Sequence, residues 1–113
     1  NEFAVRVKNA LNAGVVRIIG DVQKVVKTVA VLTGSFDDDF NALKEKKADV
    51  IVTGDVKYHS AVKALEEEIC VIDAGHFETE RVIVPWIAKL IGQRFIEVKV
   101  MASASEKSPY IYH

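Results

Sequence analysis

The sequence is poor in cysteine, in proline and in long apolar runs, and each shortage narrows what the chain can be. Cys70 is the only cysteine, so no disulfide can form within the chain, and its place in the apolar run ICVID indicates a reduced core residue. No apolar run approaches the roughly 18 residues that a membrane helix needs, and the amino terminus has no signal-peptide pattern. We therefore expect a cytoplasmic protein that does not cross a membrane. The chain begins at Asn1 without a methionine, which indicates an internal position of a longer product or removal of what came before.

The charge balance also lacks any strong bias. The 113 residues include 15 basic and 16 acidic side chains, for a net charge of −1, and the basic residues form no cluster. Nucleic-acid binding is not expected, because contacts to phosphates need clustered cations. Half of the residues are hydrophobic, which is typical of a globular domain, and the length suits one core.

Strands and helices alternate in the predicted secondary structure. A short helix ends before Gly14, and a second helix spans 37–47. In helix 57–68 the spacing of Tyr58, Val62 and Leu65 predicts a buried stripe. Pro85 predicts a kink or break in the long helical stretch that follows, before an irregular tail. Strands are predicted at 15–20 and 27–34, joined by a short loop, and at 49–54, 70–75 and 96–103.

Three of these strands end alike, in a small residue, a glycine and a polar side chain: VAVLTGS, DVIVTGD and CVIDAGH. Their near-continuous apolar runs and the helices between them predict parallel strands buried on both faces. The carboxyl ends of such strands meet at one edge, where open α/β sheets bind ligands. The polar residues expected to converge at this edge are Ser35, Asp55, His59, Asp73, His76 and Glu80.

His76 and Glu80 are the strongest candidate ligands. Their i, i+4 spacing at a helix start places both side chains on one face, where they can bind one cation such as zinc, iron, manganese or cobalt. A solvated surface pair, or a glutamate that only stabilises the helix start, is the alternative. The preceding Asp73 and Gly75 place the pair on the ligand-binding edge and favour the metal reading.

Asp55 and His59 repeat the same spacing one strand earlier, with Lys57 between them. We expect Asp55, Lys57 and Asp73 to line the pocket and His59 to transfer protons or hold a ligand, although Asp55 also suits a helix cap. The turn LTGSFDDD lacks the Walker pattern, and its aspartates would repel phosphate, so it is interpreted as a helix start. The apolar stripe that includes Trp86 is typical of a core or subunit interface.

In these motifs the sequence resembles the NIF-three-like dinuclear metal proteins, often described as GTP cyclohydrolase I type 2. The matching segments are VAVLTGS, ADVIVTGDVKYHSA and VIDAGHFETE, in the order and spacing of the family's second half. The resemblance implies a three-layer α/β/α sandwich with a mostly parallel or mixed sheet. It implies that residues 1–113 form one α/β domain, the carboxyl-terminal half of a two-part protein with two related halves.

The resemblance also implies a site. His76 and Glu80 would bind metal, with Glu80 bridging two divalent ions, and the remaining ligands would come from the first half, including a His-His pair that this chain lacks. Phe36 departs from the family, which often has a second glycine there. Family members form rings, commonly hexamers, so an isolated half is expected to expose Val82, Ile83 and Trp86.

Two functions follow from the resemblance. One is metal-assisted hydrolysis of a nucleotide-like small molecule, with a proton shuttled by His59. The other is a metal-binding regulatory or metal-handling scaffold, in which Lys57 and His59 bind a partner or metabolite without a chemical step.

Overall fold

The computed structural model describes residues 2–36 and 40–112. Over these residues the chain alternates between helices and strands, as the sequence predicts, and none of the helices described is long and apolar enough to cross a membrane. The elements are α1 (Glu2–Ala10), β1 (Arg17–Ile19), β2 (Val29–Ser35), α2 (Phe40–Glu45), β3 (Val50–Gly54), α3 (Tyr58–Glu66), β4 (Cys70–Asp73), α4 (His76–Arg81) and α5 (Ile83–Arg94). Residues 37–39, where the predicted second helix begins, lie outside the described part.

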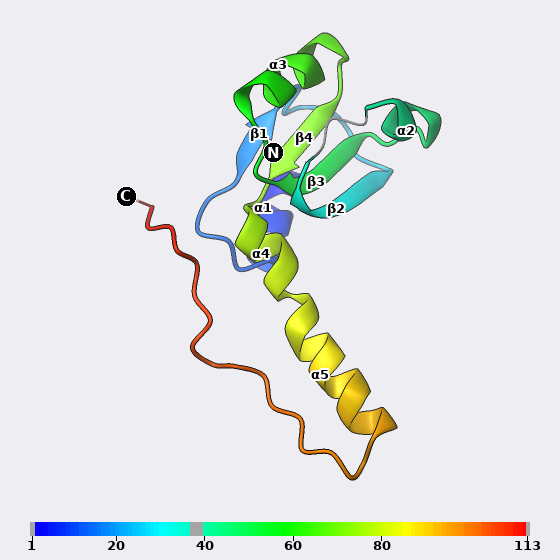
Figure 1. Cartoon of the computed structure of the whole chain (residues 1–113). Helices are drawn as coiled ribbons and strands as arrows, with labels where there is room; N and C mark the ends of the chain where they lie inside the picture. Colours follow the sequence, from blue (N-terminus) through cyan, green and yellow to red (C-terminus); the bar gives the residue numbers. More distant parts are fainter. Residues whose placement is uncertain (1, 37–39, 113) are drawn as a thin grey trace.

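The four strands form one mixed sheet in the order β1-β4-β3-β2 (Figure 1). β2, β3 and β4 are parallel, and β1 lies antiparallel to β4. In the register of β3 and β4, Val50 lies opposite Cys70 and Thr53 opposite Asp73, so both strands end at the same edge. The predicted parallel arrangement of the three glycine-ended strands is therefore confirmed.

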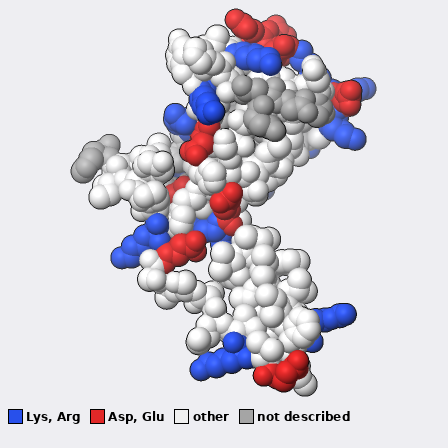
Figure 2. All heavy atoms as spheres, viewed as in Figure 1, with Lys and Arg blue, Asp and Glu red and all other residues white. Residues whose placement is uncertain are grey.

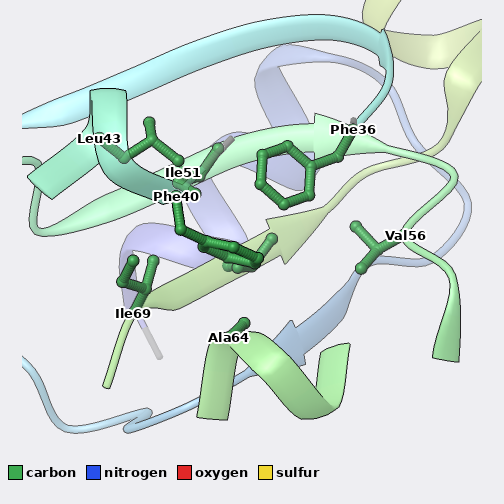
Figure 3. Packing of buried hydrophobic residues seen from close by; sticks show 8 residues of the cluster. Phe36, Phe40, Leu43, Ile51, Val56, Ala64 and Ile69 are labelled. Atoms are coloured by element: carbon green, nitrogen blue, oxygen red, sulfur yellow. The ribbon is translucent and has the colours of Figure 1, made fainter. Parts of the chain in front are cut away.

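Helices cover both faces of the sheet, which confirms the three-layer α/β/α class. On one face Phe40 and Leu43 of α2 and Ala64 of α3 pack on Ile51 and Val71, and Phe36 joins this cluster (Figure 3). On the other face Ala4 and Val7 of α1 pack on residues of β3 and β4, among them Cys70. All five residues of β3 are buried, as expected for a strand covered on both sides.

β1 and β2 are consecutive strands, as predicted, but they do not pair with each other, because they lie at opposite edges of the sheet. The start of β2 is instead fixed beside β3 by Asp49, whose carboxylate accepts hydrogen bonds from the amides of Lys27 and Thr28 at 2.8 and 2.7 Å. These two backbone donors lower the pKa of Asp49. A local sequence pattern could not reveal this contact between distant segments.

The predicted buried stripe of α3 is wrong. Tyr58 and Leu65 are 78% and 56% exposed, whereas Ser60 and Ala64 are buried. The helix lies on the sheet through its small side chains, so its large apolar residues point outward. Spacing identified the helix but not the side that faces the core.

A break separates α4 from α5 at Val82, as predicted near Pro85. Pro85 lies in the first turn of α5, where a backbone N–H has no acceptor within the helix, so proline is tolerated there. α5 leaves the body of the molecule and has no buried residue (Figure 1).

The predicted strand at 96–103 is wrong. This segment belongs to an irregular chain that follows α5 and runs back toward the sheet (Figure 1). Ile96 is almost fully exposed, so the alternation of apolar residues does not mark a face against a core. The tail does pack back, since a side chain at Gly14 would meet the ring of Tyr112 at 3.5 Å.

Candidate metal centre

The candidate site lies where the three parallel strands end. Gly34, the second-last residue of β2, has a φ of +71°, a conformation that residues with a side chain rarely adopt. A Cβ at Gly34 would lie 2.7 Å from Oε1 of Glu80 and 3.3 Å from Nε2 of His76. At the end of β3, a Cβ at Gly54 would lie 2.6 Å from the amide nitrogen of His76. The repeated glycines thus allow two strand ends to approach the start of α4 closely.

His76 and Glu80 come together on α4, with Asp55 beside them. Nε2 of His76 is 3.1 Å from Oε1 of Glu80, and Nδ1 of His76 is 2.9 Å from Oδ2 of Asp55. An ionised carboxylate only accepts hydrogen bonds, so Nδ1 carries a proton toward Asp55. The imidazole is therefore held with Nε2 toward Glu80.

This arrangement changes the proton affinity of the imidazole. The hydrogen bond that His76 donates to Asp55, together with the negative charge of Glu80, raises the pKa of His76 above its ordinary value of 6.5. With Nδ1 protonated, a neutral imidazole would face Glu80 with the lone pair of Nε2 opposite a carboxylate oxygen. Two acceptors at this distance repel each other unless a proton or another cation lies between them.

Asp55 occupies an unusual backbone position. Its φ is +50°, which costs energy for a residue with a side chain and is best tolerated by Asp and Asn. The residue at the N-cap of α3 is Lys57, whose side chain makes no capping hydrogen bond. The Asp55 carboxylate is used toward His76 and not as the helix cap that the sequence also allowed.

Asp73 is buried and organises the loops around the site. Its carboxylate accepts hydrogen bonds from the amides of Val56 and Gly75, both at 3.0 Å, and pairs with the guanidinium of Arg17. The loops after β3 and β4 are thereby tied to each other and to β1. Asp55 and Asp73 both line a cavity of about 270 Å³, and Asp55 is also the residue that contacts the His76 side chain.

Lys57 and His59 are exposed, and of the residues described neither lines this cavity. The ring of His59 packs edge-on against Tyr58, with ring centres 5.8 Å apart. The roles expected for these two residues stay predictions.

Sequence reasoning missed Thr79, which is buried between the two candidate ligands. Its hydroxyl accepts a hydrogen bond from the amide of Gly34 at 3.1 Å and lies 2.9 Å from the carbonyl oxygens of Gly75 and His76, to which it donates. Thr79 thus ties the end of β2 to α4. Thr79 lies in HFETE, on the same helical turn as the candidate ligands, and this position could have indicated that it belongs to the site.

Phe36, where the family often has glycine, is a core residue. It is buried, and its ring packs against Phe40 with centres 4.9 Å apart. The substitution extends the hydrophobic cluster beneath α2 (Figure 3).

His76 and Glu80 lie close enough together to bind the same cation. Ligands about 2.1 Å from one cation lie within about 4.2 Å of each other, so the 3.1 Å between His76 and Glu80 is compatible with a shared cation. In metal sites a histidine that binds the ion through one ring nitrogen typically donates a hydrogen bond to a carboxylate through the other, as Nδ1 of His76 does to Asp55. Over residues 2–36 and 40–112, no group of three or more His, Cys, Asp or Glu side chains is arranged to hold a metal ion.

Solved structures of other proteins share this fold. The crystal structure of Staphylococcus aureus protein SA1388 superposes with a TM-score of 0.91 and 32% sequence identity, over 99% of this chain and 38% of that one. The structure of a Bacillus cereus protein related to NIF3 gives a TM-score of 0.81 and 30% identity, over 99% and 32% of the two chains.

Sequence comparison agrees. The chain is 36% identical to the GTP cyclohydrolase 1 type 2 homolog of Campylobacter jejuni over 106 residues, which cover 94% of this chain and 42% of the relative. The homolog of Bacillus subtilis is 32% identical over 98% of this chain and 31% of its own length. The chain thus spans less than half of these relatives. The model of the family Duf34/NIF3 (NGG1p interacting factor 3) matches residues 1–109, and this chain belongs to that family.

Proposed function

We propose that this chain supplies His76 and Glu80 to a divalent-metal centre. The observation that carries the proposal is the 3.1 Å between Nε2 of His76 and Oε1 of Glu80, with Asp55 on the other side of the imidazole. A proton on Nε2 bridges the two atoms in the metal-free chain, a divalent cation would take its place, and the ligand types suit zinc, iron, manganese or cobalt.

The remaining ligands would come from outside these 113 residues. Two protein ligands hold a metal weakly, whereas functional sites use three or four. The chain covers 42% of the Campylobacter jejuni relative and 31% of the Bacillus subtilis one, which leaves room for the other ligands in a longer protein. We propose that such a segment would complete a two-metal centre, in which Glu80 would be a ligand shared by the two ions.

We propose metal-dependent hydrolysis of a nucleotide-like substrate as the activity. A bound divalent ion polarises substrate oxygens and lowers the pKa of a coordinated water. In this chain His76 and Glu80 would hold the ion, Asp55 orients the imidazole, and His59 would shuttle the proton. The choice of a nucleotide rests on the names of relatives, which are GTP cyclohydrolase 1 type 2 homologs.

Metal titration of the purified chain tests the ligand assignment. Calorimetry with Zn²⁺ or Mn²⁺ should detect weak binding that His76→Ala and Glu80→Gln each reduce at least about tenfold, since each removes one of two donors. Glu66→Gln, at the exposed end of α3, is the matched control and should bind as the wild type does. Undiminished binding by His76→Ala would exclude the assignment.

A non-catalytic scaffold is the second candidate, and the position of His59 favours it. Its ring contacts Tyr58 and makes no hydrogen bond with the His76 group within the described residues. GTP turnover should be assayed in a protein of the relatives' full length, with metal, beside its His59→Ala variant. Turnover that falls in the variant supports hydrolysis with His59 as the shuttle, and absence of turnover in both supports the scaffold.

A further inference from the structure

Arg17 and Asp73 form an ion pair beside the candidate metal centre. They lie directly opposite each other in the pairing of β1 with β4, so their side chains share one face of the sheet. The Asp73 side chain is only 3% exposed, whereas that of Arg17 is 64% exposed. The pair lines the cavity of about 270 Å³ together with Asp55 and with Tyr112 of the tail. In the described part of the chain neither residue hydrogen-bonds to the two candidate ligands.

The ion pair holds both backbone polar groups of Val56. The amide of Val56 donates to Oδ2 of Asp73 at 3.0 Å, and its carbonyl oxygen accepts from the guanidinium of Arg17 at 3.3 Å. The Val56 side chain is buried in the hydrophobic cluster under α2 and α3 (Figure 3). Val56 directly follows Asp55 in the sequence, so the loop is anchored next to the carboxylate that contacts the imidazole.

The backbone of Asp55 needs such an anchor. Its φ of +50° is a conformation that a residue with a side chain keeps only where the surrounding structure enforces it. With Val56 held in place, the Asp55 carboxylate lies 2.9 Å from Nδ1 of His76. If Val56 were released, Asp55 could return to a negative φ, and its carboxylate would move away from the imidazole.

The second oxygen of Asp73 acts on the other loop. Oδ1 accepts a hydrogen bond at 3.0 Å from the amide of Gly75, the residue directly before His76. One buried carboxylate thus holds the residue that follows Asp55 and the residue that precedes His76. The contact between those two side chains therefore depends on an ion pair that is part of neither.

We propose that Arg17 and Asp73 are positioning residues of the candidate metal centre. They hold Asp55 against Nδ1 of His76, which keeps the proton of the neutral ring on Nδ1 and leaves Nε2 free for the ion. The inference deepens the proposed metal function and rests on it, because it concerns how the ligand His76 is oriented. Its effect on the imidazole can be measured without metal.

The tautomer of His76 in the metal-free chain is the first test. Long-range proton–nitrogen correlation spectra, recorded in EDTA at a pH where the ring is neutral, distinguish a proton on Nδ1 from one on Nε2. The wild type should carry it mainly on Nδ1, because the contact with Asp55 is shorter than that with Glu80, 2.9 against 3.1 Å. Asp73→Asn and Arg17→Met should each move it mainly to Nε2, where Glu80 accepts it.

Asp49→Asn is the matched control. Asp49 also accepts two backbone amides, those of Lys27 and Thr28, but it does so before the start of β3, at the other end of the strand from Asp55. This variant should lower the urea denaturation midpoint and leave the proton on Nδ1. A purely structural role of Asp73 would make the two Asp→Asn variants alike.

Zn²⁺ affinity, measured by calorimetry, is the second test. Asp73→Asn and Arg17→Met should each weaken binding at least about tenfold, as is usual when a partner of a ligating histidine is lost. In an Asp55→Ala background, Arg17→Met should cause no further loss, because Arg17 acts through Asp55. Asp49→Asn should bind as the wild type does.

The outcomes separate this inference from the metal proposal. Arg17→Met removes the cation from a buried carboxylate and could unfold the chain, whereas Asp73→Asn leaves only an exposed arginine unpaired and decides the matter alone. A proton on Nε2 in the wild type, or one that stays on Nδ1 in the folded Asp73→Asn chain, would overturn the positioning role. Absence of Zn²⁺ binding in the wild type would instead reject the metal proposal and leave the tautomer comparison valid.

Discussion

At the scale of single residues, the contact between Asp55 and His76 links protonation to the candidate site. The carboxylate favours the imidazolium form, so the folded pKa of His76 lies above 6.5. A raised folded pKa means that this contribution to stability is fully present below pH 6.5 and is lost as the pH rises through the folded value. A metal ion competes with the proton for Nε2, so metal affinity should rise over that same pH range.

Proton NMR of the metal-free chain measures this link directly. The titration midpoint of the His76 ring should lie above 6.5, and Asp55→Asn should lower it because a neutral amide no longer stabilises the charged ring. Glu66→Gln should not move it. If the titration midpoint of His76 is the same in Asp55→Asn as in the wild type, the hydrogen bond does not orient the imidazole in solution.

Gly34 provides a second test at this scale. Gly34→Ala adds a methyl group that meets Glu80 and His76, at a φ that disfavours alanine. We expect a loss of about 1–2 kcal/mol in the free energy of unfolding, together with weaker metal binding. Gly92→Ala is the matched change, because its Cβ meets nothing within 4 Å and α5 should gain about 0.5–1 kcal/mol. Equal effects of both changes on urea denaturation midpoints would contradict this account of Gly34.

The site could be predicted from the sequence only where local pattern determines geometry. The i, i+4 spacing of His76 and Glu80 and the glycines at the strand ends were sufficient to bring these residues together. The contributions of Arg17 and Tyr112 could not be anticipated, because contacts made by β1 and by the tail join residues far apart in the sequence.

At the scale of elements, predictions were correct where a local pattern determines the structure and wrong where contacts between distant segments determine it. β3 and β4 are short apolar runs covered on both faces, and their length, β-branched residues and flanking glycines favour a buried strand over a helix. The alternation at 96–103 is equally regular, yet the segment finds no strand to pair with in the described structure. Alternation predicts a strand only where a sheet edge is available to it.

Hydrogen exchange distinguishes these two segments. Amides of Val50–Gly54 should be strongly protected, because β3 is hydrogen-bonded on both sides. Amides of 96–103 should exchange close to the rate of an unstructured chain. Strong protection there would mean that the segment joins a sheet in solution, as its alternation suggested.

At the scale of the whole molecule, the chain is less compact than its length allows. Its radius of gyration is 16.1 Å, whereas a compact domain of 113 residues has about 13 Å. The difference comes from α5 and the tail, which extend from the sheet (Figure 1). In the view of Figure 2, charges gather at the far end of this arm and again where it meets the body of the molecule, and much of the surface between them is uncharged.

The exposed face of α5 leads to a prediction about association. Ile83, Trp86 and Leu90 are each about half exposed along one helix, with Trp86 at 59%, although apolar side chains of this size are usually covered. Self-association would cover this face and agrees with the oligomer expected from the sequence. We expect sedimentation velocity to detect species larger than the 12.5 kDa monomer.

Trp86→Glu should shift this distribution toward monomer, because burying a carboxylate in place of an interface tryptophan weakens association by about 2 kcal/mol or more, roughly thirtyfold. Val25→Glu, at another exposed apolar position in the loop between β1 and β2, should leave the distribution unchanged. If both variants sediment as the wild type does, α5 is not the associating surface. A wild type that is monomeric at high concentration would instead mean that the face requires a different chain to cover it, and the self-association expected here would be wrong.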